Sequence, residues 1–403
     1  MSGVKRIARR GDLLAIFAMI FLVDVAIGIY RATISLYASS LGATLTMIGI
    51  LGAVEGLTVL LVALPIGGLS DRIDRRTVVG GGLLLFTAAY LLCSVASTPL
   101  LLYPSRALIG VSVAATFYVG IAFISDIVEE ADRGLTIGIY TTCMGLGFAL
   151  GAVLGGRIAE DVGYRAGYLV AAVVVLVSLA LLRWGPARQG ARPRPAKVGK
   201  SEPLSAKLAL LGRKPVLLAA CLGYMGIAMA NEGAIFNFFP LYAASLSIGV
   251  AFIGTMFSVR MLFSSAVRVP TGALVNKLSS RRLMIAALVL SMTSLFGIAF
   301  STDPAILIVL LVGEGVAFGM YFVAGSAAVA EQTSEANRGT ATGLFIMAGS
   351  IGVMLGPLAL GAAADRWGLN TVFLFTAIVL MAVVIVILTL SARSRGGVSE
   401  SSQ

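Results

Sequence analysis

Apolar stretches of about 20 residues recur along the whole length of this chain, and this feature constrains its fold most strongly. Each stretch is long enough to form a helix that crosses about 30 Å of hydrocarbon. The chain is 58% hydrophobic and only 12% charged, whereas about a quarter of the residues in a soluble domain are charged. The stretches lack the alternation of a membrane barrel, and an open sheet would leave backbone groups unpaired in lipid. The sequence therefore predicts an all-α membrane protein.

We predict twelve transmembrane helices. The first follows Lys5, Arg6, Arg9 and Arg10, as a secretory signal would, but it is too long and lacks a small-residue cleavage site, so we expect it to be retained. The predicted helices lie at residues 13–38, 44–69, 77–97, 100–126, 134–158, 166–184, 214–243, 248–275, 283–301, 304–329, 339–363 and 370–391.

The net charge of +11 could suggest a nucleic-acid partner, but the positions of the basic residues argue against one. Most of the 30 Lys and Arg fall in loops and tails on one side of the predicted helices, and only Arg157, Arg165 and Arg366 lie at the opposite ends. This is the positive-inside bias of a multi-pass protein of the cell membrane. It predicts cytoplasmic termini and contact with anionic membrane lipid.

An internal repeat divides the chain in two. Glycine falls on glycine repeatedly when the sequence is compared with itself 205 positions later, as for Gly28 with Gly233, Gly49 with Gly254, Gly110 with Gly315, Gly147 with Gly352 and Gly151 with Gly356. We predict an amino-terminal six-helix bundle at 1–184, a cytoplasmic linker at 185–213 and a carboxyl-terminal six-helix bundle at 214–403. The hydrophobic end of the linker could form a short surface helix. Because six-helix copies share their orientation, a solute site is expected between them.

Enzyme chemistry finds little support in this sequence. The chain has no histidine, so imidazole cannot ligate a metal or relay protons. Cys93, Cys143 and Cys221 all fall inside predicted helices, where they resemble small apolar packing residues. We identify no nucleotide loop, no metal-ligand cluster and no nucleophile beside a base. We therefore expect no cofactor, no metal and no enzymatic activity.

The loop between the second and third predicted helices carries a recognisable motif. Its sequence GGLSDRIDRR, from Gly67 to Arg76, resembles the Gly-x-Leu-Ala-Asp-Arg-x-Gly-Arg-Arg signature of the major facilitator superfamily, with Asp74 at a position where that family usually has glycine. A degenerate copy begins at Gly272 and has Asn276 in place of Asp71. The resemblance implies a fold of two pseudo-symmetric six-helix bundles. It also implies that Asp71 faces the amino end of helix eleven, where free N–H groups favour a carboxylate.

Gating between conformations is expected at the cytoplasmic helix ends, since breaking the Asp71 contact would accompany opening to the cytoplasm. The alternative is a basic turn kept only for topology. Several charged residues match at the repeat offset and suit gates between helices and basic loops better than a substrate site. The expected gating residues are Asp71, Arg72, Arg75, Asp126, Arg133, Glu331 and Arg338.

Two further motifs extend the resemblance over essentially the whole chain. Arg106 followed by Gly110 is similar to the family's second signature, although Ile109 replaces its usual glutamine. Small residues in helix five follow the spacing of the family's antiporter motif and recur in helix eleven; either they seal an interface, or they only pack helices closely. They are Gly138, Gly147, Gly151, Gly155 and Gly156, with Gly352, Gly356 and Pro357 in the repeat.

Ionisable residues also occur deep inside the predicted helices. Each costs at least about 2.5–3.5 kcal/mol to insert, so they are candidates for substrate binding and proton coupling. Most lie in one layer near the middle of the bilayer, and the resemblance implies that those of helices one, four, seven and ten face a central cavity. The candidates are Asp24, Arg31, Glu55, Arg106, Glu232, Arg260 and Glu314.

Two ion pairs are expected within this layer, because neighbouring antiparallel helices place Arg31 beside Glu55 and Glu232 beside Arg260. Either pair could simply lock helices together. Asp24 and Glu314 then remain as the carboxylates with the least obvious partners. A carboxylate without a partner in a low-dielectric site can gain and lose a proton near neutral pH.

The prediction is a monomeric secondary transporter that exports small amphipathic organic compounds in exchange for protons. Sodium is an alternative coupling ion, because carboxylates serve both. A rival is a proton symporter that imports a small organic anion, whose carboxylate would bind to Arg31, Arg106 or Arg260. A non-transporting receptor with the same fold would need an output module, and the sequence offers only the linker and a short tail. A channel would need a continuous water path, which alternating halves deny.

Overall fold

The structure is a computed structural model that describes residues 10–184, 214–275, 277–333 and 337–399. These residues form helices joined by short turns, and no strand occurs among them. Twelve helical spans in the described ranges are long and apolar enough to cross a membrane. The predicted fold class and all twelve predicted spans are therefore confirmed, with ends that differ by a few residues.

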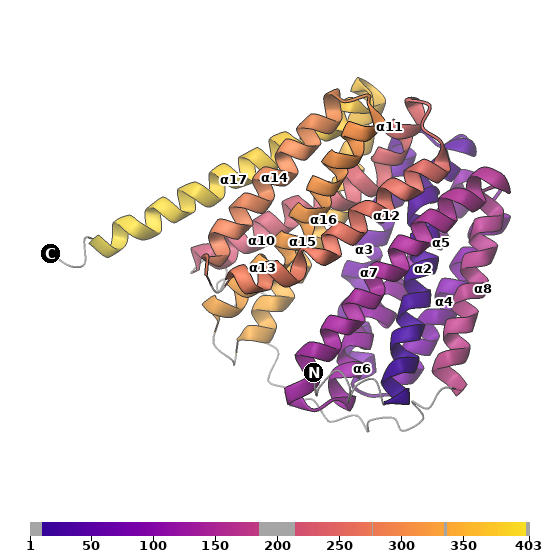
Figure 1. Cartoon of the computed structure of the whole chain (residues 1–403), viewed down its shortest axis with the longest axis horizontal. Coiled ribbons are helices and arrows are strands. Elements are labelled where there is room, and N and C mark those ends of the chain that lie inside the picture. The colour runs from indigo at the N-terminus through magenta and orange to yellow at the C-terminus, as the bar shows by residue number, and fades with distance from the viewer. Residues whose placement is uncertain (1–9, 185–213, 276, 334–336, 400–403) are drawn as a thin grey trace. The chain divides into compact units, whose positions relative to one another are not determined.

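The helices of the amino-terminal half form long, closely packed rods (Figure 1). The fourth span is continuous from η1 to α6. The elements are α2 (Gly11–Ser40), α3 (Leu45–Ser70), α4 (Arg75–Val95), η1 (Pro99–Leu101), α5 (Leu102–Val113), η2 (Ala114–Tyr118), α6 (Val119–Ile127), α7 (Glu130–Asp161) and α8 (Tyr164–Trp184).

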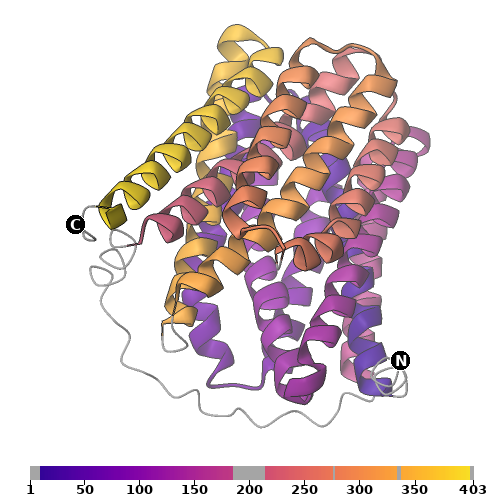
Figure 2. The same ribbon diagram turned by 60° about the vertical axis from the view of Figure 1, so that its left-hand side comes forward.

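The helices of the carboxyl-terminal half are similar rods, which the turned view also displays (Figure 2). Here α10, η3 and α11 make one span, and α12 with α13 makes the next. The elements are α10 (Pro215–Ala228), η3 (Met229–Phe238), α11 (Phe239–Ser245), α12 (Val250–Ala266), α13 (Arg268–Val275), α14 (Ser280–Phe300), α15 (Pro304–Gln332), α16 (Arg338–Trp367) and α17 (Asn370–Ser399).

The chain divides into two compact units by its internal contacts. The first comprises Met1–Val198 together with Ala243–Leu262, so most of α12 belongs with the amino-terminal helices. The second comprises Gly199–Tyr242 and Phe263–Gln403. The predicted domain boundaries stay a prediction, and both the linker at 185–213 and its surface helix lie outside the described residues.

Polar side chains cap the amino-terminal ends of several helices. The Thr44 hydroxyl accepts a hydrogen bond from Met47 N at 3.2 Å and begins α3. Asp74, which replaces the glycine usual in the loop motif, accepts from Arg76 N at 3.2 Å and caps α4. Asp303 caps α15 in the same way through Ala305 N, at 2.7 Å. Because each side chain satisfies an otherwise unpaired N–H, the local sequence determines where these helices start.

The repeat seen in the sequence is present in the hydrogen bonding of both units. In the first unit, Tyr37 Oη donates to Ala96 O at 2.7 Å. In the second, Tyr242 Oη donates to Ser301 O at 2.9 Å. The two donors are 205 positions apart in the sequence, and so are the two acceptors. Equivalent buried tyrosines therefore make the same hydrogen bond to the end of a neighbouring helix in each unit.

Large apolar side chains remain exposed on the outer faces of the helices. Leu61 is 64% exposed, Val173 59%, Phe296 55% and Val309 69%. In water such surfaces would favour aggregation, whereas lipid tails solvate them. The pattern is that of helices that present one side to lipid and the other to their neighbours.

Candidate functional site

A charged cluster lies buried in the first unit, where three helices meet. Glu55 on α3 accepts a hydrogen bond from Arg31 Nη2 on α2 through Oε1 and from Arg106 Nη1 on α5 through Oε2, both at 2.5 Å. The exposed fractions of the side chains are 15% for Arg31, 5% for Glu55 and 3% for Arg106. One carboxylate thus holds two guanidinium groups, and these three residues together carry one positive charge.

Part of this cluster was predicted. The ion pair between Arg31 and Glu55 is confirmed, whereas the sequence did not indicate that Arg106 shares the same carboxylate. A glycine one turn after Arg106 explains the meeting of α5 with α3. A Cβ at Gly110 would lie only 2.8 Å from Thr58 Cβ and 2.9 Å from Glu55 O, so the two backbones approach closely only because this residue is glycine.

An aromatic group supports the Arg106 side of the cluster. The guanidinium carbon of Arg106 lies 5.2 Å from the centroid of the Tyr30 ring, in cation–π range. Tyr30 in turn packs against Tyr90, with ring centroids 5.6 Å apart, and against Tyr168 at 6.1 Å. All three tyrosines are at most 1% exposed. The cluster therefore lies in a largely buried aromatic environment, where its charges interact more strongly than in water.

Asp24 lies two helical turns before Arg31 on α2 and is 5% exposed. Its Oδ2 has no hydrogen-bond partner among the residues that the structure describes. Its neighbours on α7 are Tyr140 and Cys143, which lie within electrostatic range, and Gly147, where a Cβ would stand 3.1 Å from Asp24 Cβ. Arg31 is close enough to interact electrostatically with the Asp24 carboxyl group. Asp24 is thus a buried acid in the interface between α2 and α7.

The glycine motif of α7 builds that interface. A Cβ at Gly151 would lie 2.8 Å from Val25 Cα, and one at Gly155 would lie 2.5 Å from Ile29 Cα. These glycines therefore pack α7 directly on the backbone of α2. Gly156 instead faces α12, where its Cβ would lie 3.0 Å from Ala251 Cα, and a Cβ at Gly138 would meet nothing within 4 Å.

The copy of the motif in α16 packs in the same way inside the second unit. A Cβ at Gly352 would lie 3.2 Å from Met225 Cα, and one at Gly356 would lie 3.0 Å from Met229 Cα. Gly233 in η3 returns the contact, since its Cβ would lie 3.3 Å from Pro357 N. Close helix packing is thus the structural role of the motif glycines other than Gly138, and a role in the direction of transport stays a prediction.

The remaining charged residues of the predicted layer are distributed over both units. Arg260 on α12 is 1% exposed and belongs to the first unit, whereas Glu232 belongs to the second, so their expected pair stays a prediction. Glu232 lies in the π-helical segment η3 and accepts from Asn231 Nδ2 at 3.1 Å. Glu314 on α15 is completely buried and takes part in an interaction, so it has a partner although the sequence made none obvious; its coupling role stays a prediction.

The expected gating residues form a contact at the end of the first unit. Arg75 Nη1 lies 3.0 Å from Asp126 Oδ2, and Arg75 Nη2 lies 3.7 Å from Asp71 Oδ1. At the positions 205 residues later, Ser280 Oγ donates to Glu331 Oε1 at 2.6 Å. The Arg75–Asp126 ion pair of the first unit therefore corresponds to a hydrogen bond from a neutral hydroxyl, Ser280, to Glu331 in the second. The sequence comparison did not reveal this correspondence.

The other gating candidates make fewer contacts within the described part of the chain. Arg133 Nη2 donates to Ser125 O at 3.2 Å. Arg72 is exposed in the loop. The side chain of Arg338 is outside the described part of the chain, and the contact expected between Asp71 and helix eleven joins the two units, so it stays a prediction.

Comparison with known proteins agrees with the geometry. The family model described as Major Facilitator Superfamily matches residues 16–245 and 225–403. An MFS-type transporter of Methanocaldococcus jannaschii is 24% identical over 381 residues, which cover 91% of this chain and 95% of that protein. The class C tetracycline resistance protein of Escherichia coli is 27% identical over 335 residues, covering 79% of this chain and 81% of that protein.

Solved structures share the fold at low identity. The nucleoside transporter NupG superposes with a TM-score of 0.77 at 15% identity, covering 94% of this chain and 99% of that one. A bacterial homolog of the human lysosomal transporter Spinster, in an inward-facing and occupied conformation, gives a TM-score of 0.80 at 15% identity, covering 94% and 96%. The chain therefore belongs to the major facilitator superfamily and is a multi-pass membrane transporter of small-molecule substrates.

Proposed function

We propose that this transporter exports small amphipathic organic compounds from the cell in exchange for protons, with Asp24 as the group that carries the proton. The observation that carries the proposal is the burial of Asp24, whose Oδ2 has no hydrogen-bond partner among the described side chains and backbone. An ionisable group is costly to hold at this depth, so it is a functional candidate by default.

The setting of Asp24 supports a coupling role. The acid lies at the interface that the α7 glycines form with α2, and a carboxylate there changes its surroundings whenever the two helices shift. Arg31, which acts on its charge, belongs to the cluster with Glu55 and Arg106. Protonation of Asp24 would therefore alter the electrostatic balance of the adjacent cluster, which is the requirement for linking a proton to a conformational change. Glu314, completely buried in the second unit, is proposed as a second protonatable group.

Relatives support export as the direction. The class C tetracycline resistance protein matches most of this chain, and the multidrug efflux pump LfrA of Mycolicibacterium smegmatis is 34% identical over 164 residues, which cover 40% of this chain and 31% of that protein. Their names indicate resistance and efflux, so we propose the same class of substrate here: small organic molecules with apolar bodies.

The test uses purified protein in proteoliposomes that contain a pH-sensitive dye and have an acidic lumen. Tetracycline and ethidium are added outside as probes. We expect uphill uptake of at least one probe, accompanied by alkalinisation of the lumen. Asp24→Asn should abolish the pH change and uphill uptake while downhill exchange of the probe continues. Asp12→Asn, which removes a partly exposed acid near the start of the same helix, is the matched control.

Two results would contradict the assignment. If Asp24→Asn and Glu314→Gln both still drive uphill movement with a pH gradient, the coupling role of these acids is wrong. If a sodium gradient, and not a pH gradient, drives transport, the coupling ion is sodium.

A second candidate is a proton symporter that imports an organic anion. The positive charge of the cluster favours it, since two guanidinium groups share one carboxylate and could recognise an anionic substrate. Loss of organic-anion binding in Arg31→Gln, with unchanged ethidium and tetracycline transport, would select this alternative.

A further inference from the structure

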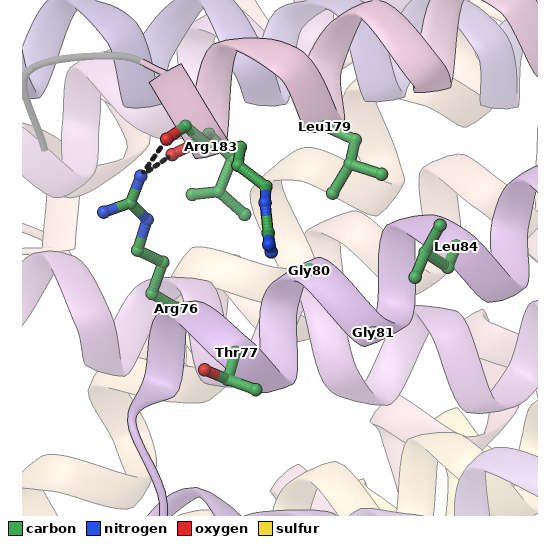
Figure 3. Close-up of a pocket in the computed structure, with 8 residues that line it drawn as sticks. Arg76, Thr77, Gly80, Gly81, Leu84, Leu179 and Arg183 are labelled. Carbon is green, nitrogen blue, oxygen red and sulfur yellow. Dashed lines mark hydrogen bonds between the residues drawn. The ribbon is translucent and has the colours of Figure 1, made fainter. Parts of the chain in front are cut away.

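A groove of about 780 Å³ opens between α4 and α8 in the first unit. Arg76, Gly80, Gly81 and Leu84 line it on the α4 side, and Leu179 and Arg183 line it on the α8 side (Figure 3). Neither Asp24 nor Glu55 lines the groove, and the proposed transport mechanism does not use it.

Two consecutive glycines create the space. A Cβ at Gly81 would meet nothing within 4 Å, and one at Gly80 would meet only the methyl groups of Leu179 and Leu182, both at 3.8 Å. Helix packing therefore does not require a glycine at position 81. The missing side chains leave a strip of bare helix backbone that an extended hydrocarbon chain could cover.

Arg76 fixes the polar end of the groove. Its Nη2 donates to Arg183 O at 2.8 Å and also to Leu182 O (Figure 3). These carbonyls end α8 and have no partner within their own helix. The Arg76 guanidinium is thereby held at the rim of the groove, in one orientation, by the end of the neighbouring helix.

Arg183 adds a second positive charge beside the first. Its guanidinium extends toward Gly80 in Figure 3 and forms no hydrogen bond or ion pair with any residue in the described ranges. The Arg183 side chain is exposed, so the charge is available to a ligand.

The groove is amphipathic along its length and lies at a membrane boundary. The membrane span of α4 begins at Arg75 and that of α8 ends at Arg183, so the two arginines stand where lipid headgroups are expected. Leu84, about two helical turns after Arg76, is 55% exposed, as is expected of a side chain in contact with lipid tails. Basic pockets between membrane helices at this depth suit anionic headgroups.

We propose that this groove binds one anionic phospholipid, with the phosphodiester between Arg76 and Arg183 and an acyl chain along Gly80, Gly81 and Leu84. A planar guanidinium suits a phosphate, since it can donate two parallel hydrogen bonds. Arg183 is placed to do so, whereas Arg76, whose Nη2 donates to the end of α8, would contribute its positive charge at the rim. The bound lipid would bridge α4 and α8 at their ends, beside the hydrogen bonds that Arg76 donates to the end of α8.

Native mass spectrometry of the purified full chain in detergent tests the proposal, with added phosphatidylglycerol or phosphatidylcholine. We expect one phosphatidylglycerol to be retained in preference to phosphatidylcholine. Arg183→Gln should weaken retention about five-fold, the effect of one basic residue near a membrane surface. Gly81→Leu should weaken it through a side chain that occupies the groove while leaving the charges in place.

Arg157→Gln is the matched control, because it removes another exposed arginine, from α7, that does not line the groove. It should retain phosphatidylglycerol like the unmodified protein, and all three variants should keep the same melting temperature. The proposal is overturned if Arg183→Gln and Arg157→Gln weaken retention equally, if Gly81→Leu has no effect, or if inorganic phosphate displaces the lipid as readily as free phosphatidylglycerol does.

Discussion

Replacing Glu55 by glutamine tests whether the three-residue cluster stabilises the first unit. In the native protein one carboxylate accepts from Arg31 and from Arg106, both at 2.5 Å. The substitution keeps the size of the side chain but removes its charge. Two guanidinium groups that are 15% and 3% exposed would then face each other without the acid between them.

The magnitude follows from burial. Two unit charges about 4 Å apart attract by about 4 kcal/mol at an effective dielectric constant of about 20. Removing one partner of a buried pair costs about 3–5 kcal/mol, because the remaining charge keeps its desolvation penalty. Glu55→Gln should therefore lower the free energy of unfolding by about that amount. Arg31→Gln leaves the Glu55–Arg106 pair intact and should cost only about 1.5–3 kcal/mol, the value of one charge-assisted hydrogen bond.

Thermal unfolding in detergent, followed by intrinsic fluorescence, gives the order of stability. We expect the melting temperature to fall most for Glu55→Gln and least for Arg31→Gln. The double variant with Glu55→Gln and Arg106→Gln should recover part of the lost stability. Only one guanidinium, that of the more exposed Arg31, then remains without the Glu55 carboxylate. Equal stability of Glu55→Gln and Arg31→Gln, or no recovery in the double variant, would refute the reasoning.

Three further predictions concern packing and helix ends. Gly151→Val should prevent normal accumulation of folded protein, because its Cβ would press on the α2 backbone, whereas Gly138→Val, at an open position, should accumulate normally on a fluorescence-detected sizing column. Glu160→Gln should lower stability by about 1 kcal/mol, since Glu160 Oε2 accepts from the N–H of the second residue of α12 at 2.7 Å; an unchanged melting temperature would contradict this. Asp126→Asn should raise the rate at which a cysteine-reactive probe labels a cysteine introduced at Ile73, in the loop just before Arg75, compared with the same cysteine in the native background, because it removes the ion-pair partner of Arg75; an unchanged labelling rate would contradict this.

The sequence determined the fold because the lipid hydrocarbon that surrounds the chain permits few backbone structures. In hydrocarbon every backbone group must be bonded within the chain, so apolar runs of the right length have to be helices, and their number and ends follow from hydropathy. The repeat was also readable, because glycines that allow close packing recur in both copies. The pair between Arg31 and Glu55 could be predicted from depth alone, since neighbouring antiparallel helices bring residues of equal depth together.

Tertiary structure alone decided which side chains share a partner. Depth does not specify the rotation of a helix about its axis, so the sequence could not place Arg106 on the second oxygen of Glu55 or turn Asp24 toward α7. It could not distinguish Gly151, which a neighbouring backbone requires, from Gly81, which leaves a groove. The physical reason is that lipid solvation constrains each helix separately, whereas close packing depends on the contact between two particular helix faces.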